Sequence, residues 1–192
     1  MGTPLGEMHA ASFEVDPKHL GFVLARYYFV ARMLHGKGRV LEIGSGDGTG
    51  ARLVRETVGS LTTTDLHNLA ADLLWDMTRG PMDGVPVYDA AYALDVLEHI
   101  EPNQENDFIR NICCSLVSWG TLIIGMPSLE SQPYASELSK LHHVNCKTED
   151  QLREVLLRHF YNVFLFGMND SSLHTGYGPM CHYRLAICTG KR

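Results

Sequence analysis

The residues best suited to chemistry in this chain lie in a glycine-rich segment between two apolar runs. Residues 39–50 read RVLEIGSGDGTG, so an apolar run ends at glycines 44, 46, 48 and 50. Glycines let backbone N–H groups approach a ligand closely, because no Cβ stands in the way. Glu42, two residues before the first glycine, adds a carboxylate that repels phosphate and attracts a cation. The segment therefore favours a ligand that is cationic or rich in hydroxyl groups over a pyrophosphate.

Further carboxylates follow the next apolar stretches. Asp65 ends a segment rich in β-branched residues, where a carboxylate can accept hydrogen bonds from both hydroxyls of a ribose. Asp76 lies between Trp75 and Met77, which could sandwich an adenine while the carboxylate accepts its exocyclic amine. Asp95 ends the following strand. An adenosine site is the sharper interpretation, and turn-forming aspartates beside core residues are the alternative.

Histidines are the candidates for a general base, because an imidazole titrates near neutral pH. His99 lies one helical turn beyond Asp95, and His143 lies in the polar segment that follows the last long apolar run. We predict His143 as the base, with His99 as the second catalytic candidate. The polar segments are expected to bind an acceptor through Glu130, Gln132, Tyr134, Asn145, His174 and His182. An ordinary polar loop with surface or capping histidines is the alternative.

A metal site is an open alternative for some of the same residues. Asp95, His99, His142 and His143 could ligate an ion, but their spacing matches no recognised ligand pattern. We therefore expect no metal.

Hydrophobic periodicity predicts the elements that must position these residues. A buried strand precedes Gly44, and a short helix and a short third strand are expected within residues 67–76, where only ten residues separate Asp65 from Asp76. The other predicted strands are residues 60–64, 89–94, 121–126, 162–166 and 183–188. The predicted helices are residues 18–34, 51–58, 106–117 and one that a capping box at residues 148–151 starts and that reaches residue 160. Residues 79–86, 128–145 and 167–181 are predicted loops.

Strands that alternate with helices predict an α/β fold with a doubly wound, Rossmann-like sheet and helices on both faces. The last two strands have no helix between them, so one of them should run antiparallel to the rest. Ligands of such sheets bind beyond the carboxyl ends of the strands. Four of the five predicted ends carry a carboxylate, so these side chains should meet at one edge.

These motifs together resemble class I S-adenosylmethionine-dependent methyltransferases. Residues 40–48 match the first motif of that family, residues 89–100 its fourth-strand motif and residues 120–125 its fifth, and the resemblance covers roughly residues 18–190. It implies a seven-stranded mixed sheet with an antiparallel last strand and S-adenosyl-L-methionine as the cofactor. It also implies that Arg26 reaches the methionine carboxylate. The implied cofactor residues are Arg26, Glu42, Gly44, Ser45, Gly46, Gly48, Asp65, Leu66, Asp76, Met77 and Asp95.

A nicotinamide dinucleotide site is the second interpretation of the glycine turn, residues 44–50. Residues 46–51 satisfy the pattern GxGxxA, but a lone match of this kind is weak evidence. Glu42 and Asp47 would also lie close to the pyrophosphate, which is unfavourable.

Bulk composition limits the other classes of function. The chain has 192 residues, a net charge of −6 and no cluster of Lys or Arg, which argues against nucleic acid and anionic membranes as partners. No apolar stretch approaches the roughly 20 residues of a membrane helix. Five cysteines without a CxxC pair fit a reduced, cytoplasmic protein. We expect a single domain over residues 1–192, with an N-terminal arm at residues 1–17 and acceptor-side loops at 127–147 and 167–181.

We therefore predict an O-methyltransferase for a small hydroxylated metabolite or sugar precursor, working by in-line displacement with a histidine base, and a possible homodimer. An N-methyltransferase, a protein or RNA methyltransferase and a scaffold without catalysis are the alternatives.

Overall fold

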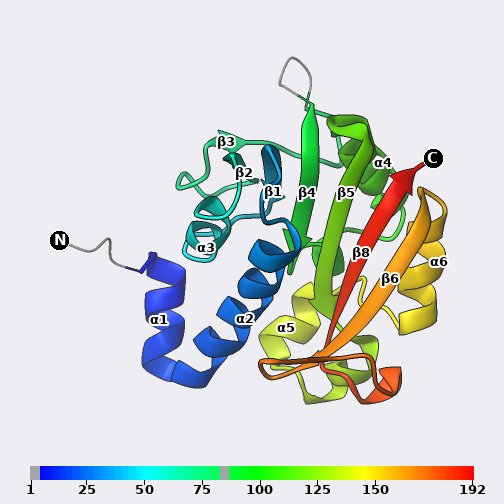
Figure 1. Cartoon of the computed structure of the whole chain (residues 1–192). Helices are drawn as coiled ribbons and strands as arrows, with labels where there is room; N and C mark the ends of the chain where they lie inside the picture. Colours follow the sequence, from blue (N-terminus) through cyan, green and yellow to red (C-terminus); the bar gives the residue numbers. More distant parts are fainter. Residues whose placement is uncertain (1–4, 83–86) are drawn as a thin grey trace.

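One mixed sheet forms the centre of the molecule (Figure 1). The computed structural model describes residues 5–82 and 87–192, so the predicted loop at 79–86 lies partly outside the described residues. Within the described ranges the sheet has eight strands in the order β3-β2-β1-β4-β5-β8-β6-β7. The strands are β1 Arg39–Ile43, β2 Ser60–Asp65, β3 Leu73–Leu74, β4 Tyr88–Leu94, β5 Leu116–Pro127, β6 Phe160–Asn169, β7 Ser172–His174 and β8 Tyr183–Lys191.

Strand directions confirm a mixed sheet whose last strand is reversed. Neighbouring strands from β3 to β5 pair in parallel, and β8 lies between β5 and β6, antiparallel to both. The expected count of seven strands was wrong, because β7 pairs with β6 within the predicted loop 167–181. A tight turn at Asp170, whose φ is 52°, makes this hairpin possible, since Asp tolerates the left-handed conformation better than most residues.

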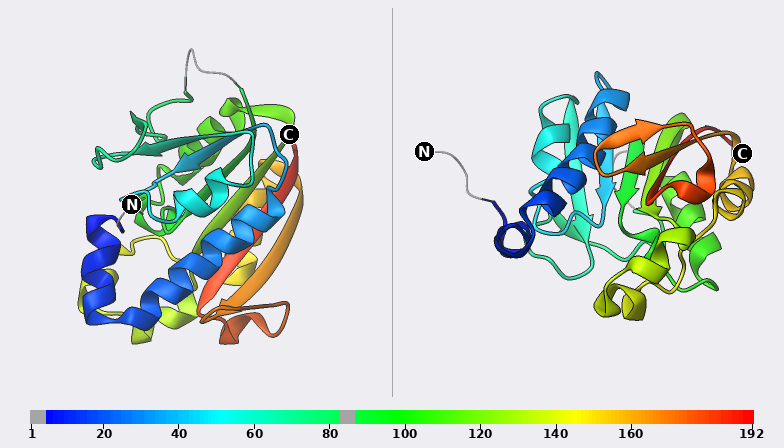
Figure 2. Two further views of the ribbon diagram at one scale, coloured as in Figure 1. Left: turned by 60° about the vertical axis from the view of Figure 1, so that its left-hand side comes forward. Right: turned by 90° about the horizontal axis from the view of Figure 1, so that it is seen from below.

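The two faces of the sheet bury separate cores, and each is covered by helices (Figure 2). Helix α2 (Pro17–Met33) and helix α3 (Ala51–Arg55) pack on one face, where Val40 of β1 is fully buried. Helix α4 (Glu105–Ser115) and helix α6 (Glu149–Leu157) pack on the other, against Leu41. This alternation along β1 is the period of two that a strand imposes.

Several helix bounds differ from the predicted ones for local reasons. Helix α4 ends at Ser115 because β5 already begins at Leu116, and α3 stops at Arg55. The capping box of α6 is present, with Thr148 and Gln151 bonded reciprocally, but α6 ends at Leu157 because Phe160 belongs to β6.

Two predictions about the segments between strands were wrong. The short helix expected between β2 and β3 is absent from the described residues, and Asp72 instead ties the segment to β2 by accepting from the N–H and hydroxyl of Thr63. Conversely, the segment after β5 holds two short helices, η2 (Leu129–Tyr134) and α5 (Glu137–His142). Ser128 and Ser136 cap their N-termini.

The predicted N-terminal arm contains helix α1 (Glu7–Val15), which has no buried residue. It is held by polar contacts to the glycine turn: the backbone N–H of Gly6 donates to Thr49 Oγ1 at 2.9 Å, and that of His9 to Asp47 Oδ2 at 2.8 Å. The described helices all lack an apolar stretch long enough to cross a bilayer.

Candidate functional site

A cavity of about 1470 Å³ opens at the carboxyl ends of β1, β2 and β4. Its wall contains the glycine turn, Asp65, Asp76 and Asp95, so the predicted strand-end carboxylates after β1 do meet at one edge of the sheet. The cavity extends from these residues to η2 and α5, and is large enough for a nucleoside-sized ligand and a second small molecule.

The glycine turn is shaped by one close approach. Gly44 has a φ of 74°, and a Cβ at this position would collide with Val96, which follows β4. The backbone N–H groups of Gly44 and Ser45 donate to the carbonyl oxygen of Thr64 in β2 at 2.8 and 3.0 Å. Of the predicted cofactor residues in the turn, Gly44, Ser45 and Gly46 line the cavity, whereas Gly48 lies outside its described lining.

Glu42 does not reach the cavity surface as the charge argument implied. Its side chain is 1% exposed and lies under the turn, outside the cavity lining. Burial raises the pKa of Glu42 to about 7, although the nearby phenol groups of Tyr27 and Tyr92 act in the opposite direction. Glu42 can therefore act on a ligand only from beneath the turn.

Asp65 is already organised by backbone donors. Its Oδ2 accepts from the N–H of Gly46 at 3.0 Å, and its Oδ1 accepts from the N–H groups of His67 and Asn68, each at 2.9 Å. These bonds hold the carboxylate at the cavity wall, next to the half-exposed Leu66.

The Trp75–Asp76–Met77 group also lines the cavity. Trp75 is fixed by a hydrogen bond from its Nε1–H to the carbonyl oxygen of Gly80 at 3.2 Å, and Met77 is 2% exposed. Asp76 accepts from the N–H and hydroxyl of Thr78 and pairs with Arg79, so part of its hydrogen-bonding capacity serves its own turn.

Arg26 and Asp95 form a pair across the cavity. The Nη1 of Arg26 lies 3.0 and 2.8 Å from the two carboxylate oxygens of Asp95, and the guanidinium stacks over the ring of Tyr183 at 3.8 Å. Asp95 has a φ of 56°, which turns the chain toward η1 (Leu97–His99). Both predicted cofactor residues line the cavity while bonded to each other.

Only part of the predicted acceptor set lies on the described lining. Gln132, Tyr134 and His182 do, but Glu130 pairs with the buried Arg184 at 2.9 Å, and Asn145 bonds to Glu105 at 2.8 Å. His174 lies on β7, away from the cavity. Glu130 and Asn145 form their hydrogen bonds with partners distant in sequence, and His174 lies elsewhere. None of these three residues therefore belongs to the acceptor side of the cavity.

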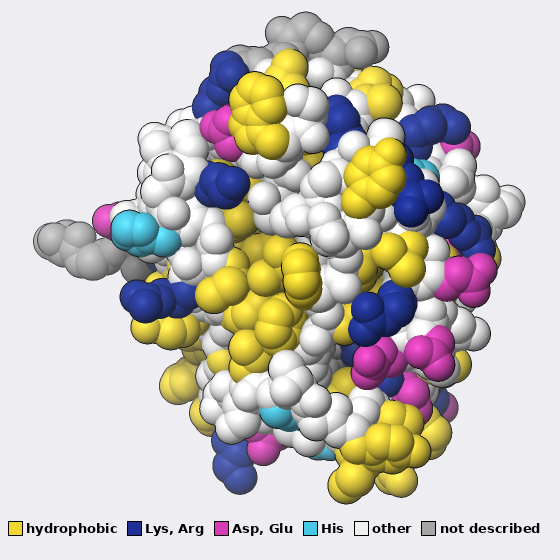
Figure 3. Space-filling view, turned by 45° about the vertical axis from the view of Figure 1, so that its right-hand side comes forward, with side chains coloured by type: hydrophobic (Ala, Val, Ile, Leu, Met, Phe, Trp, Pro, Cys, Tyr) yellow, Lys and Arg dark blue, Asp and Glu magenta, His cyan; other side chains and the backbone are white. Residues whose placement is uncertain are grey.

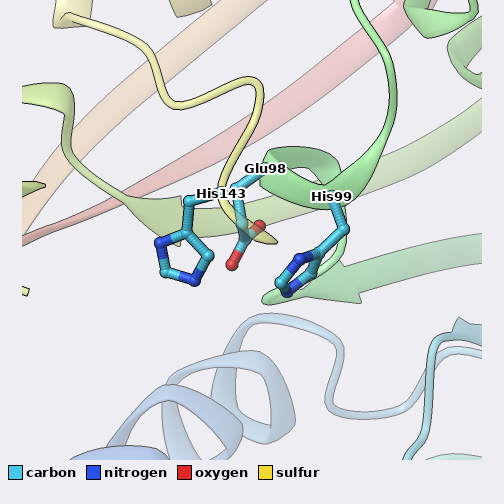
Figure 4. Close-up of side chains that lie close together, drawn as sticks. All are labelled: Glu98, His99 and His143. Carbon is cyan, nitrogen blue, oxygen red and sulfur yellow. The ribbon is translucent and has the colours of Figure 1, made fainter. Parts of the chain in front are cut away.

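The two predicted catalytic histidines come together, and Glu98 joins them (Figure 4). The rings of His99 and His143 lie 5.1 Å apart between centroids. The Nδ1 of His143 is 2.9 Å from Gln132 Oε1, and the Nδ1 of His99 is 3.0 Å from the backbone oxygen of His142. Burial, followed by the charge of His99, lowers the pKa of His143.

Glu98 was missed by the sequence analysis, as was the contribution of α1. Glu98 is fully buried, and burial followed by the charge of Asp95 raises its pKa well above the usual value. Met8, His9 and Ser12 of α1 line the cavity opposite the strand ends. The adjacency of Glu98 to His99 directly after a strand was the available signal for Glu98.

Comparison with known proteins relates the fold to solved structures. No protein-family model and no curated protein matches the sequence. The plantazolicin methyltransferase BpumL in complex with SAH has a TM-score of 0.67 at 10% identity, with 96% of this chain and 89% of that chain covered. N-methyltransferase NodS from Bradyrhizobium japonicum has a TM-score of 0.64 at 14% identity, with 92% and 98% covered.

The CurJ carbon methyltransferase has a TM-score of 0.63 at 14% identity, with 86% of this chain covered. This chain spans 54% of the length of that structure. The chain has the class I methyltransferase fold. In this fold the cavity occupies the place at the strand ends where the sequence motifs predicted the cofactor site.

Proposed function

We propose that this protein is an S-adenosylmethionine-dependent methyltransferase. The observation that carries the proposal is the convergence of the glycine turn, Asp65, the Trp75–Met77 group and Asp95 on one cavity in a methyltransferase fold. Fold alone does not fix an activity, so the argument rests on how well these side chains match the parts of the donor.

The residues present fit an adenosyl ligand. Gly44, Ser45 and Gly46 line the cavity at the strand ends, where a ligand would contact the turn. Asp65 would accept from the ribose hydroxyls, and Trp75 and Met77 would cover an adenine whose amine faces Asp76. Leu66 would add an apolar contact. Arg26 would bind the methionine carboxylate through the guanidinium N–H groups that do not bond to Asp95.

Bound S-adenosylmethionine would supply an electrophilic methyl group, which transfers by in-line displacement. The chain has to supply proximity and alignment, since holding two reactants in the right geometry removes much of the barrier. The cavity continues past Asp95 to Gln132, Tyr134 and His182, so an acceptor placed there would face the donor end of the site.

We propose a small hydroxylated acceptor with oxygen as the methylated atom. The polar groups on the acceptor side can bind hydroxyls: Ser131, Gln132, Tyr134, Ser139 and His182. His143 is suited to accept a proton, because its lowered pKa keeps the ring neutral and Gln132 leaves its Nε2 lone pair free. His99 is the second candidate.

Carbon, nitrogen and RNA acceptors are the alternatives. Similar structures are described as a carbon methyltransferase and an N-methyltransferase. An RNA acceptor is disfavoured by the net charge of −6. On the face in Figure 3, Lys and Arg side chains gather toward one side next to acidic groups, and hydrophobic side chains occupy the centre.

Calorimetric titration of the full chain with S-adenosylhomocysteine tests the proposal. We expect saturable binding with a dissociation constant of tens of micromolar or tighter. Asp65→Asn should weaken it by about tenfold or more, because hydrogen bonds to a charged acceptor contribute about 1.5–3 kcal/mol. Asp107→Asn, on the exposed surface of α4, is the matched control and should bind normally. Absence of binding, or equal affinity in the Asp65 variant, would overturn the assignment.

A further inference from the structure

Glu98 is a buried carboxylate that lacks a partner. It is 0% exposed, and neither of its two oxygens has a hydrogen-bond donor among the described residues. An isolated carboxylate in such a place is strongly unfavourable, and buried charges in proteins are normally paired or bound to a metal. A carboxyl group in such a place is either protonated or paired with a cation.

Two imidazoles point to the same place as that carboxylate (Figure 4). One potential ligand atom from each of Glu98, His99 and His143 lies within 4.8 Å of the other two. Glu98 and His99 come from η1, directly after β4, and His143 follows α5. The fold thus brings together one carboxylate and two imidazoles from segments more than 40 residues apart in sequence.

Each imidazole is oriented by an acceptor at its other nitrogen. The backbone oxygen of His142 accepts from Nδ1–H of His99 at 3.0 Å, a bond that selects the tautomer with its lone pair on Nε2. Gln132 Oε1 plays the same part for His143 at 2.9 Å, and the amide group of Gln132 is itself held by the carbonyl oxygen of Ser128 at 3.2 Å. Second acceptors of this kind fix the tautomer of metal-binding histidines.

We propose that Glu98, His99 and His143 bind a divalent first-row transition-metal cation. Two imidazole nitrogens and one carboxylate oxygen suit ions such as Zn²⁺, Fe²⁺ or Co²⁺, whereas Mg²⁺ prefers oxygen ligands alone. The ion would supply the missing partner of Glu98. This set differs from the one considered on sequence grounds, because Asp95 is bonded to Arg26 and the side chain of His142 lies outside the cluster.

An ion held by these three residues would lie beside two cavities. Glu98, His99 and His143 line the large cavity, and the two histidines also line an adjoining cavity of about 460 Å³ with Leu138, Ser139 and His142. Three protein ligands with a free position are typical of catalytic rather than structural metal sites.

A role in the reaction rests on the proposed function. An acceptor hydroxyl bound to the ion would be oriented toward the donor end of the cavity and would have a lowered pKa, because the cation stabilises the alkoxide. Its proton would pass to solvent, since coordination uses the Nε2 lone pair of His143 that a free base would need. In the metal-bound protein the ion would promote loss of the hydroxyl proton, which in the metal-free protein His143 would accept.

Titration of the untagged, chelator-treated full chain with Co²⁺, followed by calorimetry and visible absorption, tests this site. We expect one equivalent to bind and to give an absorption band of a cobalt–imidazole complex. Glu98→Gln, His99→Ala and His143→Ala should each weaken binding by about tenfold or more, and Gln132→Ala should weaken it by about tenfold. His142→Ala keeps the backbone oxygen that orients His99 and should bind Co²⁺ like the original chain.

Two outcomes would overturn the inference. One is the absence of saturable Co²⁺ binding, and the other is a Glu98→Gln variant that remains folded by circular dichroism and binds Co²⁺ unchanged. Titration of the metal-free chain with S-adenosylhomocysteine separates this failure from that of the proposed function. Binding of S-adenosylhomocysteine without binding of Co²⁺ rejects the metal site alone. Binding of Co²⁺ without binding of S-adenosylhomocysteine rejects the methyltransferase proposal alone.

Discussion

Arg26 of α2 and Asp95 at the end of β4 are bonded across the candidate cofactor site, with Nη1 of Arg26 at 3.0 and 2.8 Å from the two carboxylate oxygens. The guanidinium has five N–H donors, and in the described part of the chain the bonds to Asp95 come from Nη1 alone. Arg26 can therefore bind a second carboxylate without releasing Asp95. The pair links the helix that covers the cavity to the strand end that lies beneath it.

Arg26 should bind the amino-acid carboxylate of the methyl donor. Arg26→Met should weaken binding of S-adenosylhomocysteine by about tenfold or more, since a charged hydrogen bond contributes about 1.5–3 kcal/mol. Binding of 5′-methylthioadenosine, which lacks the amino-acid carboxylate, should change much less. Calorimetry with both ligands provides the comparison, and Arg32→Met at the exposed end of α2 is the control. An equal loss for both ligands would mean that Arg26 does not contact the carboxylate.

Glu42 predicts a pH dependence of stability. Its folded-state pKa of about 7 lies above the usual 4.5, so the folded state holds a proton that the unfolded state has lost in that interval. The free energy of unfolding should therefore fall as pH rises from about 4.5 to 7, by up to about 3 kcal/mol from this group. Glu42→Gln should flatten this part of the profile.

Urea unfolding of both proteins between pH 4.5 and 8 measures the effect, with Glu56→Gln as an exposed control. If the Glu42→Gln profile runs parallel to that of the original chain, the buried carboxylate does not titrate as described.

Alanine substitution at two glycines with similar backbone angles distinguishes backbone strain from steric collision. Gly36 and Gly44 have φ values of 80° and 74°, but a Cβ would meet nothing within 4 Å at Gly36 and would collide with Val96 at Gly44. Gly36→Ala should lower the free energy of unfolding by about 1–2 kcal/mol through the left-handed conformation alone. Gly44→Ala should lose more stability and should also lose S-adenosylhomocysteine binding.

The double variant Gly44→Ala/Val96→Ala should recover part of the lost stability, which denaturant melts can measure. No recovery would show that Val96 does not set the geometry of the turn.

Helix α1 should be the least stable part of the site. It buries no residue and is held by polar contacts, including the 2.6 Å contact between Nδ1 of His9 and Oδ1 of Asp47. His9→Ala should speed amide hydrogen exchange over residues 7–15 and weaken S-adenosylhomocysteine binding several-fold, with little change in Tm. His35→Ala, at an exposed position after α2, should alter none of these readouts. Unchanged exchange in α1 would contradict this account of its attachment.

The sequence was most informative where a pattern is local. The apolar run into Gly44, the β-branched run into Asp65 and the capping box at Thr148 each lie within a few residues, and the structure has β1, β2 and α6 at these places. The reversed β8 also followed from a local observation, the lack of a helix between the last two strands.

Features that depend on distant partners were not predictable. Glu130 and Asn145 look like free polar residues, but Arg184 lies 54 positions after the first and Glu105 lies 40 positions before the second. The short helices η2 and α5 depend on single serine caps in a segment without strong periodicity. Glu98 is fully buried, and its unpaired state among the described residues is visible only in the fold.

Fluorescence of Trp75 in a Trp119→Phe variant tests the central claim most directly. Trp75 lines the cavity beside Asp76, whereas Trp119 is 73% exposed and lies outside the lining, so the variant reports on the proposed adenine position alone. We predict a saturable change in emission with S-adenosylmethionine and with S-adenosylhomocysteine, and none with NAD. An emission that both adenosyl ligands leave unchanged at millimolar concentration, or that NAD changes equally, would contradict the assignment of this cavity to a methyl donor.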